Sequence, residues 1–129
     1  MPIVSNPQVR RISVPVGSAK VVLVLRAYSS EEYSKFMSGR FNFKKKGKLE
    51  DRSMQSRIEF IDNLLVDIEA LDADGGPDFV TYMVDNVTSQ RLTPQVENWK
   101  SYVNPSWKIS VGLELEGQSA ETEDGAIKN

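Results

Sequence analysis

A stripe of apolar residues between positions 54 and 71 constrains the fold more than any other feature of the chain. Its members recur at intervals of three or four residues, the spacing that places side chains on one face of an α-helix. The pattern predicts a helix over about residues 49–71 at the centre of the fold. The stripe consists of Met54, Ile58, Ile61, Leu65 and Ile68, widened by Leu64 and Leu71.

Two strands are predicted before this helix. "VVLVLRAY", residues 21–28, is rich in β-branched residues and is bounded by turn residues, as strands commonly are. "VRRISVPV", residues 9–16, alternates imperfectly, and Pro15 restricts it to a sheet edge or a strand end. Because "GSAK" between them is typical of a turn, we expect a β-hairpin that follows an irregular arm over residues 1–8.

Start signals predict three further helices. Ser29 and Glu32 have the spacing of a capping box, so a short helix is expected from there to about Gly39. Pro77 suits the first turn of a second helix, and Thr93 with Pro94 suits the start of a third over "QVENWKSYV". The second helix would carry Phe79, Val80, Met83 and Val87 on one side.

"DADGGPD", residues 72–78, is predicted to terminate the helix over residues 49–71. Its aspartates and glycine have some of the spacing of a calcium loop, but the twelfth position is Met83 instead of a bidentate glutamate. A helix terminator is therefore favoured over a metal site, and we expect no metal.

The last element, residues 105–116, is left open. Trp107, Ile109, Val111, Leu113 and Leu115 alternate with polar or small residues, which indicates a strand. Asn104-Pro105 is instead a helix start signal, and three of these apolar residues would also share a helical face. Residues 117–129 are polar and acidic, and we expect a flexible tail there.

These elements predict an α+β fold, with an N-terminal β-hairpin packed on about four to five helices in a single domain over residues 1–116. A chain of 129 residues is near the commonest size for one domain. The longest apolar run is too short to cross a bilayer, and the N-terminus lacks the apolar core of a signal peptide. We expect a cytoplasmic protein with no membrane partner.

The absence of cysteine and histidine narrows the possible chemistry. It removes disulfides, thiol nucleophiles, Cys/His zinc sites and the side chain that titrates near neutral pH. No motif supplies the neighbouring base that a serine, threonine or lysine nucleophile needs. We therefore expect a protein that is not an enzyme, with no catalytic residues and no cofactor.

Charge is distributed unevenly along the chain. Residues 1–60 hold 12 Lys and Arg against 5 Asp and Glu, a net charge of +7, whereas residues 61–129 hold 4 against 13, a net charge of −9. Such asymmetry is found in proteins with a nucleic-acid face, with an acidic tail, or with subunits that stack through complementary surfaces. Complementarity within one fold is the simplest alternative.

The basic stretch around "FNFKKKGKLED", residues 41–51, is the first candidate binding site. It could bind phosphate, with Phe41 and Phe43 stacking on bases, or it could be a solvated loop that meets an acidic protein surface. The second interpretation is favoured, because no nucleic-acid reading motif is present and the pI is near 5.2. The candidate partner-binding residues of this stretch are Arg40, Lys44, Lys45, Lys46 and Lys48.

Aromatic residues in "NWKSYVNPSWK", residues 98–108, are the second candidate site. Trp99, Tyr102 and Trp107 could anchor a protein partner, because aromatic side chains supply much of the binding energy at interfaces. They could equally be core residues, and that alternative is favoured.

The order of these features resembles that of small tail assembly chaperones of tailed bacteriophages and prophages. The resemblance rests on a hairpin, the "SSEEYSKF" helix, a long helix with "FIDNLLVDI", the "DADGGPDF" break and an approach through "VNPSWKISVGLELE" to an acidic tail. It covers about residues 20–116.

This resemblance implies a largely helical protein without enzymatic activity that binds the tape-measure protein during tail assembly, with some self-association. It also favours a helix for the last element. Two alternatives stay open: a virion-associated tail subunit of the tube or terminator type, and a nucleic-acid-binding regulator that uses the basic loop at residues 40–52.

Overall fold

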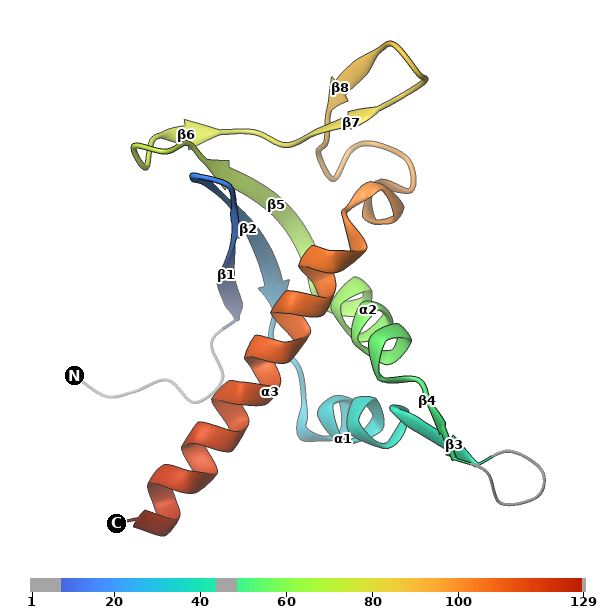
Figure 1. Ribbon diagram of the computed structural model, residues 1–129, viewed down its shortest axis with the longest axis vertical. Helices are drawn as coiled ribbons and strands as arrows, with labels where there is room; N and C mark the ends of the chain where they lie inside the picture. The colour runs from blue at the N-terminus through green and yellow to red at the C-terminus, as the bar shows by residue number, and fades with distance from the viewer. Residues whose placement is uncertain (1–7, 44–48, 129) are drawn as a thin grey trace.

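The computed structural model describes residues 8–43 and 49–128, and the side chains of residues 8–41 and 49–117 (Figure 1). Three antiparallel sheets, three α-helices and one 3-10 helix form within these residues, so the fold is α+β as predicted, with fewer helices than expected. The order is β1 (Val9–Val16), β2 (Ala19–Arg26), α1 (Ser30–Ser38), β3 (Phe41–Phe43), β4 (Leu49–Asp51), α2 (Ser53–Leu64), β5 (Leu65–Leu71), β6 (Pro77–Asp78), β7 (Thr81–Met83), β8 (Ser89–Arg91), η1 (Trp99–Tyr102) and α3 (Pro105–Lys128).

The N-terminal strands β1 and β2 form the predicted hairpin. Gly17 has φ 62°, a left-handed conformation that glycine adopts without strain in a two-residue turn. This turn makes Val16 and Ala19 a hydrogen-bonded pair of the ladder. The next pair along β1, Pro15 and Lys20, is therefore not hydrogen-bonded, and the backbone nitrogen of Pro15 points away from β2. Since β1 is an edge strand of the sheet, Pro15 removes no hydrogen bond from it.

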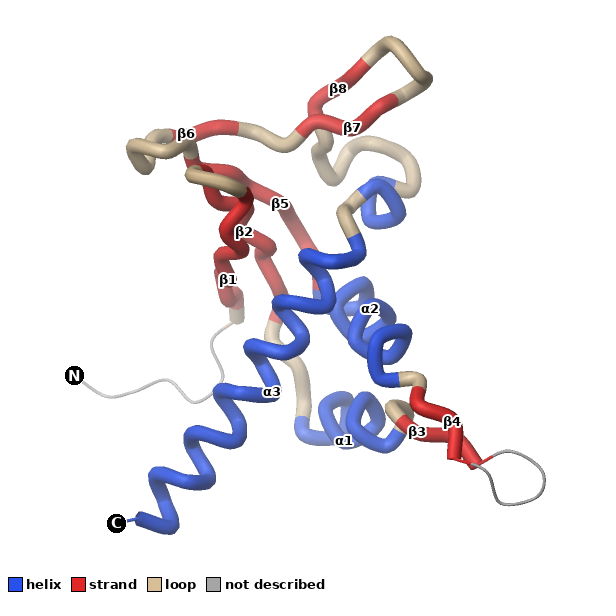
Figure 2. Tube along the Cα trace, viewed as in Figure 1, coloured by secondary structure: helices blue, strands red, loops and turns tan. Residues whose placement is uncertain are grey.

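Strand β2 is buried on both faces of the main sheet, whose order is β1-β2-β5-β6 (Figure 2). Leu23 and Leu25 belong to the hydrophobic core, while Val22 and Val24 alternate with them on the opposite face and are also buried. A buried strand needs hydrogen-bonding partners on both sides, because its backbone groups have no access to water. β5 supplies the second partner.

The helix predicted over residues 49–71 is wrong at both ends, because only Ser53–Leu64 is helical. The strand β5 begins directly afterwards and pairs with β2. A register shift opposite Val24 and Leu25 inserts Val66 as an extra residue, so that Leu65 and Ile68 face the same core although they are three residues apart. This bulge reproduces the helical spacing, which explains why the sequence pattern indicated a continuous helix.

Helices α2 and α3 pack against each other beside the sheet (Figure 1). Ile61 and Leu64 of α2 and Val111 and Leu115 of α3 are fully buried, and we call these four residues the α2–α3 seam. A side chain at Gly112 would place its Cβ 3.1 Å from Cβ and Cγ of Arg57. Glycine at this position therefore allows α3 to approach α2 closely.

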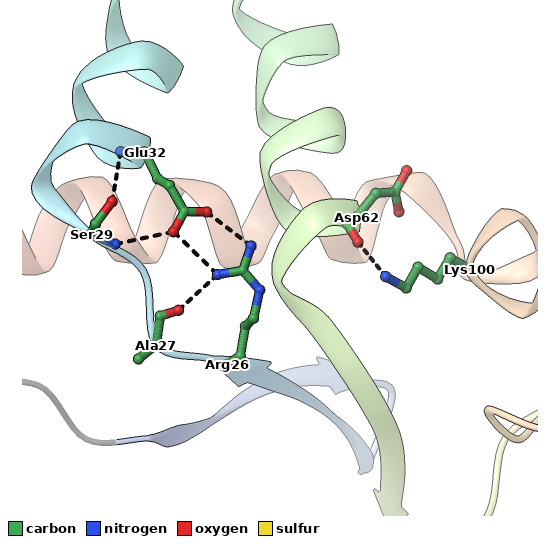
Figure 3. A network of polar contacts seen from close by, with 6 residues as sticks. All are labelled: Arg26, Ala27, Ser29, Glu32, Asp62 and Lys100. Carbon is green, nitrogen blue, oxygen red and sulfur yellow. Dashed lines mark hydrogen bonds and ion pairs between the residues drawn. The ribbon is translucent and has the colours of Figure 1, made fainter.

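Helix α1 starts with the predicted capping box. The backbone N–H of Glu32 donates to the Ser29 hydroxyl at 3.1 Å, and the Ser29 N–H donates to the Glu32 carboxylate at 3.3 Å. Arg26 at the end of β2 also pairs with Glu32, with Nη2 and Oε2 2.9 Å apart (Figure 3). These bonds fix the connection between the sheet and α1.

The helix predicted from Pro77 is also wrong, because the segment 77–91 contains the short strands β6, β7 and β8 and no helix. Asp72 holds the preceding turn, since its carboxylate accepts hydrogen bonds from the N–H groups of Asp74 and Gly76. Gly75 has φ 84° in the same turn. The turn reverses the chain, so that Pro77 and Asp78 pair with the end of β5, and "DADGGPD" terminates a strand instead of a helix.

A longer helix was predicted from Thr93 and Pro94, but only the 3-10 helix η1, Trp99–Tyr102, forms there. Asn98 has φ 58°, which interrupts a regular helix immediately before Trp99. The start signal was present, but the chain turns through residues 95–98 instead of continuing in helical geometry.

The last element is a helix, so the strand alternative for residues 105–116 is wrong. Asn104 accepts hydrogen bonds from the N–H and the hydroxyl of Ser106, and Pro105 occupies the first helical position. α3 continues to Lys128, through the segment predicted to be a flexible tail. The irregular arm predicted for residues 1–8 lies almost wholly outside the described residues.

Candidate partner-binding surface

Of the basic residues predicted as a binding site, only Arg40 lies within the described residues. Arg40 precedes β3, and its Nη1 lies 3.4 Å from Oε1 of Glu116 on α3. Its guanidinium also lies 5.6 Å from the centre of the Phe41 ring, which is half-exposed. Arg40 therefore links the hairpin of β3 and β4 to α3 as well as contributing positive charge. The other predicted residues, Lys44, Lys45, Lys46 and Lys48, lie outside the described residues.

The three aromatic residues predicted as partner anchors do not share one exposed surface. Trp99 is buried in the core, which confirms the alternative interpretation for this residue. Trp107 is partly buried and packs against the same core. Tyr102 is half-exposed, and its ring stacks on that of Tyr82 with the centroids 4.5 Å apart.

The hairpin of β7 and β8 projects from the end of the molecule opposite to β3 and β4 (Figure 1). We call residues 79–91 the β7–β8 arm. Its base is anchored, because the N–H of buried Leu92 donates to the Val80 carbonyl at 2.7 Å. Tyr82 donates its hydroxyl proton to the Gln90 side chain across the pair. The stack of Tyr82 on Tyr102 joins the arm to η1.

The β7–β8 arm exposes several large apolar side chains. Val87 at the turn is 88% exposed, and Phe79, Met83 and Val84 are each more than half exposed. Exposed apolar side chains that stand alone are ordinary, but a group on one projecting element commonly marks an interaction site. Tyr102 extends the same apolar group onto η1.

The turn of the arm is held by Asp85. Its carboxylate accepts hydrogen bonds from the N–H groups of Val87 at 2.8 Å and Thr88 at 2.7 Å. These two bonds hold the pKa of Asp85 below its ordinary value. The carboxylate is therefore ionised at neutral pH, and it orders the turn that presents Val84 and Val87.

A polar cluster fixes η1, and with it the arm, to α2 and α3. Lys108 is buried on α3, and its Nζ lies 2.6 Å from Oδ1 of Asp62 and 2.7 Å from the carbonyl oxygen of Lys100. Lys100 in turn donates to the Asp62 carbonyl at 2.7 Å (Figure 3). The arm therefore projects from a firmly attached base.

Sequence reasoning missed the arm because the apolar residues after Pro77 also fit a helical face. In the structure Val80 and Tyr82 are half-buried whereas Thr81 and Met83 are exposed, an alternation that the residue types alone do not show. Asp85-Asn86 at the centre of the segment is a turn signal that fits a hairpin better than a helix.

Among the side chains that the structure describes, in residues 8–41 and 49–117, no group of three or more carboxylates is placed to hold a metal ion. No helix in residues 8–43 and 49–128 is long and apolar enough to span a bilayer.

Comparisons with protein families, with curated proteins and with solved structures find no match for this chain. The interpretation of its surfaces therefore depends on the geometry and the chemistry of the chain itself.

Proposed function

We propose that this protein is not an enzyme and that it binds another protein through the β7–β8 arm, as a chaperone of phage or prophage tail assembly acting in the host-cell cytoplasm. The observation that carries the proposal is the exposed apolar group of Phe79, Met83, Val84, Val87 and Tyr102 at one end of the molecule. The arm is neutral at its tip apart from Asp85, so an apolar partner surface would cover it without burying many charges.

The client in this proposal is the tape-measure protein. The identity of the client comes from the resemblance in element order. The structure has the hairpin, the short helix and the final helix of that order, and it differs in the middle segment. A long helical client that is not yet enclosed by tail-tube subunits exposes apolar surface, and the arm would cover part of that surface.

Co-expression tests the proposal. The tape-measure protein encoded beside this gene should stay soluble and co-purify with the wild-type chain, but not with the variant Met83→Ser/Val87→Ser. Leu113→Ser is the matched control, because Leu113 is also about half exposed but lies on α3. Equal recovery of the client with all three proteins, or the absence of a tape-measure gene nearby, would contradict the proposal.

A tail subunit of the tube or terminator type is the second candidate. It is favoured by the opposite net charges of the two halves of the chain, which suit ring contacts between unlike surfaces. A stable large ring of the isolated protein in solution supports this candidate, and a monomer or small multimer supports the chaperone. A nucleic-acid-binding regulator is a weaker alternative, testable by the salt dependence of DNA binding.

A further inference from the structure

The two faces of the β7–β8 arm differ in what covers them. Paired residues of β7 and β8 point to the same face, and successive residues alternate between the faces. One face, which we call the inner face, holds Tyr82 and Gln90, which are hydrogen-bonded to each other, and the Tyr102 ring stacks on Tyr82. Tyr82 and half-buried Val80 also pack against the core. The inner face is therefore already used by the fold.

The opposite face, which we call the outer face, is exposed. It is formed by Phe79, Thr81 and Met83 along one strand and by Ser89 and Arg91 across the pair. Phe79 and Met83 are each more than half exposed. Because the arm projects from the rest of the molecule (Figure 1), a partner could cover the outer face without displacing any part of the fold.

Arg91 gives the outer face its charge. Its guanidinium lies 5.0 Å from the centre of the Phe79 ring, which confirms that both side chains lie on the same face. In the part of the chain that the structure describes, Arg91 makes no ion pair. A guanidinium stacked on an aromatic ring keeps N–H donors at its edge that suit a carboxylate. The outer face is therefore an apolar surface beside one positive charge.

We propose that the client of the β7–β8 arm presents an amphipathic helix whose apolar stripe covers Phe79 and Met83 and whose flanking carboxylate pairs with Arg91. This inference rests on the proposed function, to which it adds the face of the arm and the chemistry of the partner. The apolar contacts supply most of the affinity, whereas the ion pair sets the orientation of the helix and favours acidic over basic partners.

A neighbouring groove has the opposite charge preference. It has a volume of about 600 Å³, lies beside β5 and adjoins the outer face, since Phe79 and Arg91 line both surfaces. Its three carboxylates, among them Asp67 and Asp78, outnumber its two arginines, so the groove would attract a basic partner. The sign of the charge that a partner needs therefore distinguishes the outer face from the groove.

Two synthetic peptides test the proposal with the full chain. Both are helices of about 20 residues with the same leucine stripe, flanked by glutamates in one peptide and by lysines in the other. Fluorescence anisotropy of the labelled peptides at about 0.05 M salt, where charges are little screened, gives the dissociation constants. The wild-type protein should bind the acidic peptide about fivefold more tightly than the basic one.

Arg91→Glu should reverse this preference. Lys20→Glu is its control, because it makes the same change of net charge at an exposed position on β2, and it should leave the preference unchanged. Circular dichroism of each variant verifies the fold.

Met83→Ser should weaken the binding of both peptides at least about fivefold. Val84→Ser is the matched control, because Val84 is about as exposed as Met83 but points to the inner face. The N–H of Val84 donates to the Thr88 carbonyl, so the alternation of the two faces continues to this residue. Val84→Ser should bind both peptides as the wild type does.

The proposal is overturned if the wild type binds neither peptide, if it binds both equally, or if Met83→Ser and Val84→Ser weaken binding to the same extent. A preference for the basic peptide that Asp67→Asn/Asp78→Asn abolishes would also overturn it, because the groove would then be the binding site. These peptides replace the tape-measure protein, so their failure, with co-purification of that client intact, removes the acidic helix but keeps the arm as the client site.

Discussion

The α2–α3 seam and the β7–β8 arm place apolar side chains in opposite environments. The seam residues Leu64 and Leu115 are completely buried, whereas Met83 and Val87 on the arm are mostly exposed. Burial of a leucine stabilises a fold by roughly 2 kcal/mol, while an exposed valine contributes almost nothing until another surface covers it. The same residue types therefore serve folding in one region and are available for binding in the other.

We expect the largest loss of folding stability from a substitution in the α2–α3 seam. Leu64→Ala should lower the free energy of unfolding by about 2 to 5 kcal/mol, because it leaves a cavity among fully buried neighbours. Urea unfolding followed by circular dichroism measures the change. A loss below about 1 kcal/mol would show that α2 and α3 are not packed as described.

A smaller loss of folding stability is expected when the polar cluster of Asp62, Lys100 and Lys108 is altered. Lys108→Met keeps the buried stem but removes the ammonium group that contacts Asp62 and the Lys100 carbonyl. The free energy of unfolding should fall by about 1 to 3 kcal/mol, because the substitution leaves the buried Oδ1 of Asp62 without its cationic partner.

Thermal unfolding of Lys108→Met tests this value, with Lys20→Met as the control. Lys20 lies on β2 and is exposed. Equal stability of both variants would mean that the polar cluster does not hold η1 in place.

A pH-dependent effect is expected at the start of α1. The hydrogen bond and ion pair from Arg26, with the Ser29 N–H, hold the pKa of Glu32 below its ordinary value. A lowered folded-state pKa contributes stability above the unfolded-state pKa of about 4.5, and this stability is lost as the pH falls through the folded-state value. The effect should stay below about 1 kcal/mol, because both side chains are more than a third exposed.

Glu32→Gln should therefore destabilise the protein at pH 7, and the difference from the wild type should shrink as the pH falls through the folded-state pKa of Glu32. Unfolding free energies of the two proteins across this pH range give the measurement. A difference that stays constant with pH would indicate that the carboxylate charge is not what stabilises the connection between β2 and α1.

Elements that depend on local chemistry could be predicted from the sequence, whereas elements that depend on distant contacts could not. The β1–β2 hairpin and the capping box at Ser29 depend on local chemistry, and both were predicted correctly. The start signal at Pro105 is also local, but it competed with a strand pattern, and the choice between helix and strand was left open. β5 depends on pairing with distant β2 and on a bulge at Val66, neither of which is visible in the local pattern. Its apolar spacing was therefore taken for a helix.

The candidate sites were predicted less well than the fold. Trp99 and Trp107 have the residue type of interface anchors, but exposure decides their role, and the structure packs both against the core. The arm residues Met83 and Val87 were noted as the apolar side of a helix. Whether such a face is buried or exposed depends on the tertiary structure, which the spacing does not specify.

We propose that the β7–β8 arm binds a client without supporting the fold. The most direct test measures two quantities for Met83→Ser/Val87→Ser: the free energy of unfolding and the dissociation constant for the tape-measure protein. We predict unfolding within about 0.5 kcal/mol of the wild type and binding at least about tenfold weaker. Unchanged binding, or a loss of stability like that of Leu64→Ala, would contradict the account.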